Sequence, residues 1–163
     1  MMKKGNTVFF KNSPRIVSFA AICGSKEKEG IIGEYADVTL DDDMYSESTF
    51  EKAECKMLTN AISLTIEKGG LEEKDIDVML SGDLLNQIIY ASFAARDYNF
   101  PFLGVYSACS TMSESIMLAA MMVNAGYVKR AVAATGSHFA SAERQYRYPL
   151  ELGCTRPPQA QST

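Results

Sequence analysis

The sequence has no tryptophan, a single histidine and only four cysteines among its 163 residues. The cysteines stand far apart, without a CxxC pair for zinc and without the density of a disulfide scaffold, so we expect a reducing compartment. The longest apolar run, Ile116–Val123, is too short to cross a bilayer, and any membrane contact is therefore expected to be peripheral. Residues 1–11 are polar and basic around one short apolar run, so no secretory signal is expected.

The chain also has no large excess of positive or of negative charge. Sixteen Lys and Arg stand against 20 Asp and Glu, a formal net charge of −4, and no Lys/Arg-rich block is present, so we expect no nucleic-acid partner. Apolar residues make up 47% and charged residues 22%, as in globular proteins. We expect one domain over residues 1–163, with a flexible N-terminus at 1–13 and an irregular tail at 149–163. The tail has no closing element and suggests the first half of a longer fold.

Apolar runs of strand length alternate with helical patterns along the chain. Strands are expected over residues 15–23, 75–80, 102–106 and 130–135, with a loop over 25–45 and a turn at 81–83. Helices are expected from a Ser48/Glu51 capping box to Gly69-Gly70, then over 85–98 and 110–125. The first helix is expected to bury Ala53, Met57, Ala61, Ile62 and Thr65. This order predicts an α/β fold with a mostly parallel sheet and right-handed crossovers.

The helix expected over residues 110–125 is apolar on every face, and its only charge is Glu114. A helix of this kind is usually buried on all sides. A lone two-layer domain of this size does not easily surround it, so we expect a second sheet, a second domain or a partner subunit to cover it.

Cys109 lies at the joint between the strand over residues 102–106 and this apolar helix. A thiol at a helix N-terminus lies beside unpaired backbone N–H groups and the positive end of the helix dipole, which favour the thiolate. Three interpretations stay open: a buried structural cysteine, a nucleophile in acyl transfer, or the floor of a pocket that binds a small anion without chemistry.

Polar residues after the second expected strand are further candidates. Asp83, Asn86 and Gln87 follow its carboxyl end, where ligands of open α/β sheets bind, although turn and cap chemistry explains them equally well. Next to Cys109, Ser107 and Ser110 would either donate hydrogen bonds to a ligand or cap the helix.

Two candidates lie after the fourth expected strand. Arg144 would suit a carboxylate if residues 141–148 are helical, although a surface or subunit-interface role is at least as consistent with its position. His138 is the only histidine, and we expect a structural or loop-capping role for it rather than that of a general base.

Four segments of the chain resemble those of a known family. They are PFLGVYSACSTMSESIMLAAMMVNAG at 101–126, GDLLNQ at 82–87, KRAVAAT at 129–135 and AERQYRYP at 142–149. The chain resembles the N-terminal half of the thiolase superfamily and, more narrowly, the stage V sporulation protein AD family of spore-forming bacteria. The resemblance implies a thiolase-like α/β half-fold, a mostly parallel sheet with a buried central helix, incomplete without a C-terminal half.

The resemblance also implies a function. Members bind dipicolinic acid, with calcium, as part of the machinery that loads it into spores, beside membrane proteins of dipicolinate transport and peripheral to the spore inner membrane. Under this interpretation Cys109 occupies the position of a nucleophile that is no longer used, and the protein needs no cofactor. The residues expected to bind the ligand are Cys109, Ser110, Asp83, Asn86, Gln87, His138 and Arg144. The full-length protein is expected to be a homodimer. The alternative is a coenzyme A-dependent acyltransferase or condensing enzyme, with Cys109 as nucleophile and a coenzyme A thioester as cofactor, whose other catalytic groups come from the C-terminal half.

Overall fold

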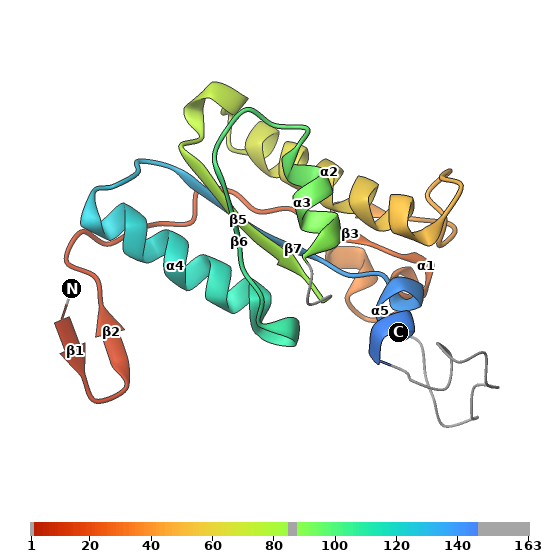
Figure 1. Ribbon diagram of the computed structural model, residues 1–163, viewed down its shortest axis with the longest axis horizontal. Helices are drawn as coiled ribbons and strands as arrows, with labels where there is room; N and C mark the ends of the chain where they lie inside the picture. The colour runs from red at the N-terminus through yellow and green to blue at the C-terminus, as the bar shows by residue number, and fades with distance from the viewer. Residues whose placement is uncertain (1, 85–87, 147–163) are drawn as a thin grey trace.

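The computed structural model describes residues 2–84 and 88–146, and a parallel three-stranded sheet lies at its centre (Figure 1). The middle strand, β5 (Val78–Asp83), pairs in parallel with β6 (Phe102–Gly104) on one side and with β7 (Ala131–Gly136) on the other. The predicted α/β class with a parallel sheet is therefore confirmed.

Helices cover both faces of this sheet. α2 (Phe50–Lys68) and α3 (Ile89–Ala95) pack on one face, and α4 (Thr111–Ala125) packs on the other (Figure 1). A shorter helix, α5 (Phe139–Tyr146), follows β7 and contacts α2. None of the helices in the described part of the chain is both long and apolar enough to span a bilayer.

Two apolar clusters hold these layers together. Successive side chains of a strand point to opposite faces of the sheet. Met79 of β5 accordingly packs with Leu58, Ile62 and Ile66 of α2, whereas Leu80 packs toward Ala119 of α4. The larger cluster lies on the α2 side, so most of the core is on that face of the sheet.

Helix α2 begins one residue later than the predicted capping box requires. Thr49, not Ser48, is the N-cap, and its side chain accepts a hydrogen bond from the backbone N–H of Lys52 at 3.2 Å. The helix ends at Gly69, as predicted.

The buried face of α2 is also rotated from the predicted one. The buried side chains are Ala53, Glu54, Leu58, Ile62 and Ile66. Burial of Ala53 and Ile62 is confirmed, but burial of Met57, Ala61 and Thr65 is wrong, since all three are only half-buried. Four of these residues are spaced four apart and form one row along the helix, which faces the sheet: Glu54, Leu58, Ile62 and Ile66. A glutamate therefore belongs to the buried row.

Strand β5 runs three residues beyond its predicted end. The turn predicted at residues 81–83 is wrong, because Ser81, Gly82 and Asp83 continue the strand, pair with β7 and are buried. A Cβ on Gly82 would lie 2.0 Å from the carbonyl oxygen of Val105 and 2.9 Å from Cγ2 of Thr111. The glycine therefore allows the next crossover to pass directly over the strand, and does not mark a turn.

Other boundaries differ by a few residues. β6 ends at Gly104 rather than at Tyr106, and α3 covers only the middle of the predicted helix at 85–98. The predicted loop over residues 25–45 contains a short helix, α1 (Ser25–Lys28), and β4 (Val38–Thr39).

The buried strand predicted over residues 15–23 is wrong. Only β3 (Ile22–Cys23) forms a strand, which pairs in parallel with β4. Ile16, Val17 and Phe19 are 74%, 70% and 73% exposed. Apolar sequence indicates a tendency toward burial, but a strand also needs a neighbouring backbone, and residues 15–20 have none among the described strands.

The start of the chain, expected to be flexible, contains a hairpin. β1 (Met2–Lys4) and β2 (Thr7–Phe9) pair antiparallel with each other and with no other described strand, and they stand apart from the central sheet (Figure 1).

Within the described residues, helix α4 is buried on one side only, so burial on all sides stays a prediction that depends on a second sheet, a second domain or a partner subunit. Thr111, Ser115 and Ala119 face the interior, whereas Ile116 and Met117 on the other side are 41% and 48% exposed. The sheet supplies one neighbouring layer, and no described element covers the opposite face. The helix ends at Gly126, whose φ of +79° suits glycine, as predicted.

The close approach at Gly82 gives a direct test. Gly82→Ala places a Cβ against a backbone oxygen that cannot move without shifting the strand, so we expect a loss of about 1–3 kcal/mol in the free energy of unfolding. Gly136→Ala, at the end of neighbouring β7, is the matched control, because its Cβ would meet Leu58 at an ordinary 3.5 Å. Urea denaturation measures both variants, and equal effects would contradict the argument.

Candidate functional site

The turn between β6 and α4, which we call the elbow (residues 105–111), carries Cys109. It begins with Val105, whose backbone N–H donates to the Ser81 carbonyl at 3.0 Å and holds the elbow against β5. Ala108 has a φ of +45°, in the left-handed region that non-glycine residues rarely adopt. A short 3₁₀ turn, Ala108–Ser110, then leads directly into α4.

Hydroxyl groups fix the shape of the elbow. Thr111 is 1% exposed, and its Oγ1 donates to the Ala108 carbonyl at 2.8 Å and accepts from the Ser107 N–H at 3.2 Å. The Ser110 hydroxyl lies 2.8 Å from the Ser107 carbonyl and 2.6 Å from the Ser107 hydroxyl. Ser107 and Ser110 thus close the turn itself, and Cys109 sits between them with an exposed side chain.

Ser110 is also the N-cap residue of α4, but its side chain makes no capping bond to that helix. The backbone N–H groups at the start of an α-helix have no partners within the helix and attract anions. The elbow therefore combines an exposed thiol, two hydroxyls and the uncapped start of a 15-residue helix.

A buried polar cluster lies on the other face of the sheet, and sequence reasoning missed its central member. Glu54 of α2 is 2% exposed, and its Oε2 has no hydrogen-bond partner among the described residues. Burial raises the pKa of Glu54 from 4.5 to about 8; the Ser141 hydroxyl and the His138 backbone amide oppose this, and the carboxylate of Asp83 adds to it. Glu54 is therefore protonated at neutral pH.

Two further side chains belong to this cluster. Asp83 is fully buried at the end of β5, and its Oδ2 accepts from the Ala91 N–H of α3 at 3.0 Å. Burial, together with Glu54, raises the pKa of Tyr90. The spacing of Glu54, four residues before Leu58 and eight before Ile62, is the sequence signal that would have found it.

His138 is held by backbone groups on both ring nitrogens. Its Nε2 lies 2.7 Å from the Asp43 carbonyl, and its Nδ1 accepts from the Ala140 N–H at 3.2 Å, so Nε2 carries the proton and donates. The ring is 6% exposed and lies against the rings of Phe50 and Phe139 at 5.0 and 4.9 Å. These contacts join the loop before α2 to the start of α5.

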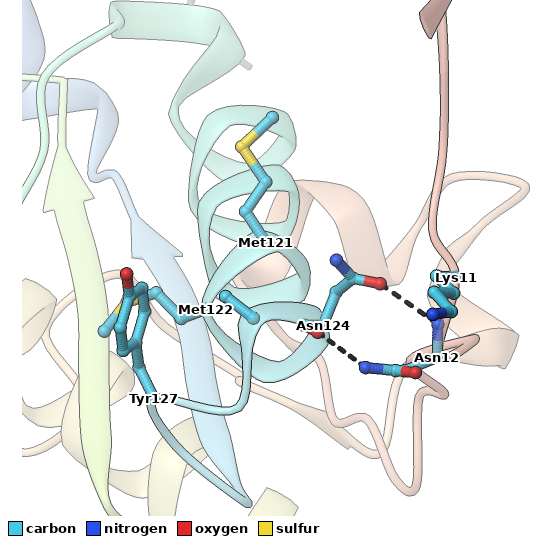
Figure 2. A pocket seen from close by; sticks show the side chains of 7 residues that line it. Lys11, Asn12, Met121, Met122, Asn124 and Tyr127 are labelled. Atoms are coloured by element: carbon cyan, nitrogen blue, oxygen red, sulfur yellow. Dashed lines mark hydrogen bonds between the residues drawn. The ribbon is translucent and has the colours of Figure 1, made fainter. Parts of the chain in front are cut away.

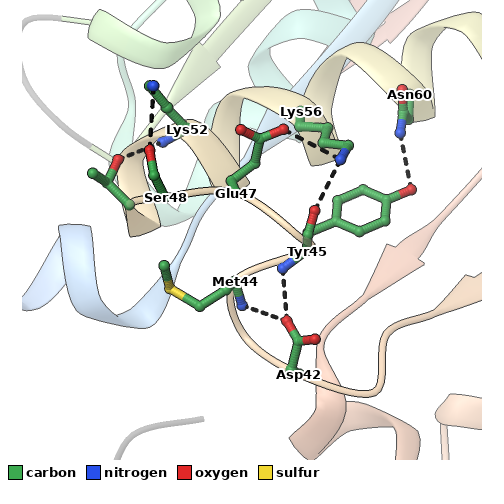
Figure 3. Close-up of polar contacts among 9 residues, drawn as sticks. Asp42, Met44, Tyr45, Glu47, Ser48, Lys52, Lys56 and Asn60 are labelled. Atoms are coloured by element: carbon green, nitrogen blue, oxygen red, sulfur yellow. Dashed lines mark hydrogen bonds and ion pairs between the residues drawn. The ribbon is translucent and has the colours of Figure 1, made fainter.

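That loop uses its acidic residues locally. Asp42 Oδ1 accepts from the backbone N–H groups of Met44 and Tyr45 at 2.8 and 2.7 Å (Figure 3). Lys56 of α2 bonds the Tyr45 carbonyl at 2.9 Å and pairs with Glu47 at 3.2 Å. Within the described ranges, no three metal-ligating side chains come together. Asp42 thus shapes the loop through its own backbone.

The predicted site residues fall into two groups on opposite faces of the sheet. Gly82 faces the elbow, so alternation along β5 turns Asp83 toward α3 and Glu54 instead. Asp83 and His138 therefore border the buried cluster, whereas Cys109 and Ser110 form the elbow. Arg144 lies on α5, but its side chain is outside the described positions, as are Asn86 and Gln87.

The elbow and the buried polar cluster both lie within a region that is similar to other proteins. The family model for stage V sporulation protein AD matches residues 4–163. The chain belongs to this family. Over 157 residues it is 41% identical to the stage V sporulation protein AD of Bacillus subtilis (strain 168). The aligned region makes up 96% of this chain and 46% of that protein. The chain thus spans about half the length of the curated relative it matches, and the family predicted from the motifs is confirmed.

The buried carboxyl group gives a pH-dependent prediction. Between pH 4.5 and about 8, unfolded Glu54 loses its proton while folded Glu54 keeps it, so rising pH favours the unfolded state. We expect this group to lower the free energy of unfolding by up to about 1.4 kcal/mol per pH unit across that window. Glu54→Gln removes this slope and makes the protein more stable than wild type above pH 8.

Glu67→Gln is the control, because Glu67 is an exposed residue of the same helix. Urea denaturation from pH 4.5 to 9 measures all three proteins. If Glu54→Gln and Glu67→Gln have the same pH slope, the buried group is not the source.

Proposed function

We propose that the chain is a non-catalytic, dipicolinic-acid-binding component of the spore dipicolinate uptake machinery, with the ligand at the elbow. The observation that carries the proposal is the exposed Cys109 on a hydroxyl-lined turn at the uncapped start of α4. Dipicolinate is a flat dianion, and its carboxylates suit the positive end of the helix dipole and the N–H groups of the first turn. Membership of a sporulation family supports the setting.

The same proposal includes the architecture of the longer family members. We propose that they have a thiolase-like fold in which the additional length covers the exposed side chains in the first half of α4, and that they form homodimers. The apolar side chains left exposed on α4, Met112, Ile116 and Met117, support this arrangement. Calcium would accompany the ligand, and dipicolinate-transport membrane proteins would be partners at the spore inner membrane.

A second function is favoured by one feature of the elbow. A strained residue, Ala108, precedes an exposed cysteine at a helix start, the placement expected of a nucleophile in a coenzyme A-dependent acyltransferase or condensing enzyme. Such chemistry also needs a base beside the thiol. His138 has both ring nitrogens on backbone groups, and Asp83 and Glu54 lie on the other face of the sheet. None of these three side chains is such a base, so in this second function the base would come from the C-terminal half.

Dipicolinate binding is tested by isothermal titration calorimetry on the 163-residue chain. Cys109→Asp puts a negative charge on the elbow, and we expect at least a tenfold loss of affinity from repulsion of the dianion. Cys109→Ser keeps the size and the charge and is expected to bind within about threefold of wild type. Asn99→Asp adds the same charge at an exposed loop position and is the control.

Acetyl-coenzyme A separates the two functions. The chain is incubated with it, and intact-mass and peptide mass spectrometry then look for an acetyl group on Cys109. We expect none. An acetylated Cys109 together with no heat of dipicolinate binding would overturn the proposal in favour of the acyltransferase.

A further inference from the structure

The hairpin of β1 and β2 is the most isolated element of the structure. Among residues 2–84 and 88–146 its strands pair only with each other, and it stands away from the central sheet (Figure 1). All its strand residues are exposed except Val8, which is half-buried. A lone two-stranded hairpin is only marginally stable in water, so this one is expected to gain stability by docking on something else.

The charge of the chain is segregated at the same place. Residues 1–15 contain four of the 16 Lys and Arg and none of the 20 Asp and Glu, so the remaining residues carry a formal charge of −8. The four cations are Lys3, Lys4, Lys11 and Arg15, and all are exposed. The hairpin end is therefore a basic pole on an acidic protein, and a negatively charged partner would meet this end first.

Apolar side chains lie among these lysines. The register puts Met2 opposite Phe9 and Lys4 opposite Thr7, and alternation along each strand places all four on one face. Met2 is 65% exposed and Phe9 is 47% exposed. Lys3 projects from the other face, so positive charge surrounds the hairpin instead of marking one side.

A shallow hollow of about 440 Å³ continues this surface at the base of the hairpin. The described residues that line it include no acidic one; they are Lys11, Asn12, Met121, Met122, Asn124, Ala125 and Tyr127 (Figure 2). Asn12 and Asn124 fasten the hairpin to the end of α4: the Asn12 N–H donates to Asn124 Oδ1 at 3.1 Å, and Asn12 Nδ2 donates to the Asn124 carbonyl at 2.7 Å. Tyr127, at the rim, is 81% exposed.

We propose that the hairpin and this hollow dock on an anionic lipid surface. Lysines around exposed methionine, phenylalanine and tyrosine side chains are the combination that binds at a charged membrane interface, where the cations meet headgroups and the apolar groups enter the boundary. Lysines on both faces suit a diffuse negative surface better than one flat protein epitope. The acidic remainder of the chain is repelled, so it faces away from the membrane.

The docking surface and the elbow are at opposite ends of the same helix. The hollow lies at the C-terminal end of α4 and Cys109 precedes its N-terminal end, and 15 residues of helix separate them by about 22 Å. Membrane docking therefore leaves the elbow open, and it does not depend on what the elbow binds. Failure of dipicolinate binding leaves this inference intact, and the reverse also holds.

Vesicle flotation of the 163-residue chain tests the inference. We expect it to float with phosphatidylcholine vesicles that contain phosphatidylglycerol, to stay behind with phosphatidylcholine alone, and to release as salt is raised. The triple variant Lys3→Gln/Lys4→Gln/Lys11→Gln is expected to lose about fivefold in partitioning per lysine, about 100-fold in total. Met2→Ser/Phe9→Ser is expected to weaken binding while keeping its salt dependence.

Lys26→Gln/Lys74→Gln/Lys129→Gln is the matched control, because it removes the same charge at exposed positions outside the hairpin. No flotation of wild type at low salt would overturn the inference, as would an equal loss in this control. Binding that ignores phosphatidylglycerol, or size-exclusion chromatography showing that the lysines join two copies of the chain instead, would also overturn it. Circular dichroism checks that every variant is folded.

Discussion

The burial of β5 is the constraint on which the rest of the structure depends. All six residues of this strand are buried, with a strand on either side and helices on both faces. A strand in this position cannot carry large polar groups on either face unless they are partnered. Its last three residues meet this condition in three ways: Ser81 is small, Gly82 has no side chain, and Asp83 accepts a backbone hydrogen bond from α3.

Gly82 and Asp83 separate two chemical environments that lie side by side in the chain. On one face, the absent side chain of Gly82 lets the elbow cross the strand and exposes Cys109 at the start of α4. On the other face, Asp83 joins Glu54 in an interior that leaves the Glu54 carboxyl protonated. His138 closes this second region by joining the loop at Asp43 to the start of α5. The first region is exposed to solvent at Cys109, whereas the second links helices around the core.

Helix α4 connects the features to which we assign function. One face packs on the sheet, its first residue is tied into the elbow by the Thr111 hydroxyl, and its last turn holds the hairpin through Asn124. The helix is rigid, so the proposed anion site and the proposed membrane-docking surface keep a fixed separation and orientation. A protein that handles a small dianion beside a membrane would need this arrangement, since the ligand and the lipid headgroups carry the same charge.

Local sequence by itself determined the order of most helices and of the strands of the central sheet, the ends of α2 and α4 at Gly69 and Gly126, the position of Cys109 at a strand-to-helix joint, and the family. These features depend on periodicity, capping and motif order, which neighbours along the chain supply. Tertiary structure alone decided that residues 81–83 continue β5, that Glu54 is buried, that residues 15–20 have no partner among the described strands, and that Asp83 faces away from Cys109. Each of these features depends on what lies across the sheet or on the next strand. Ser, Gly and Asp have the same local preference for a turn whether or not a neighbouring strand pairs with them, so the local sequence does not decide between turn and strand.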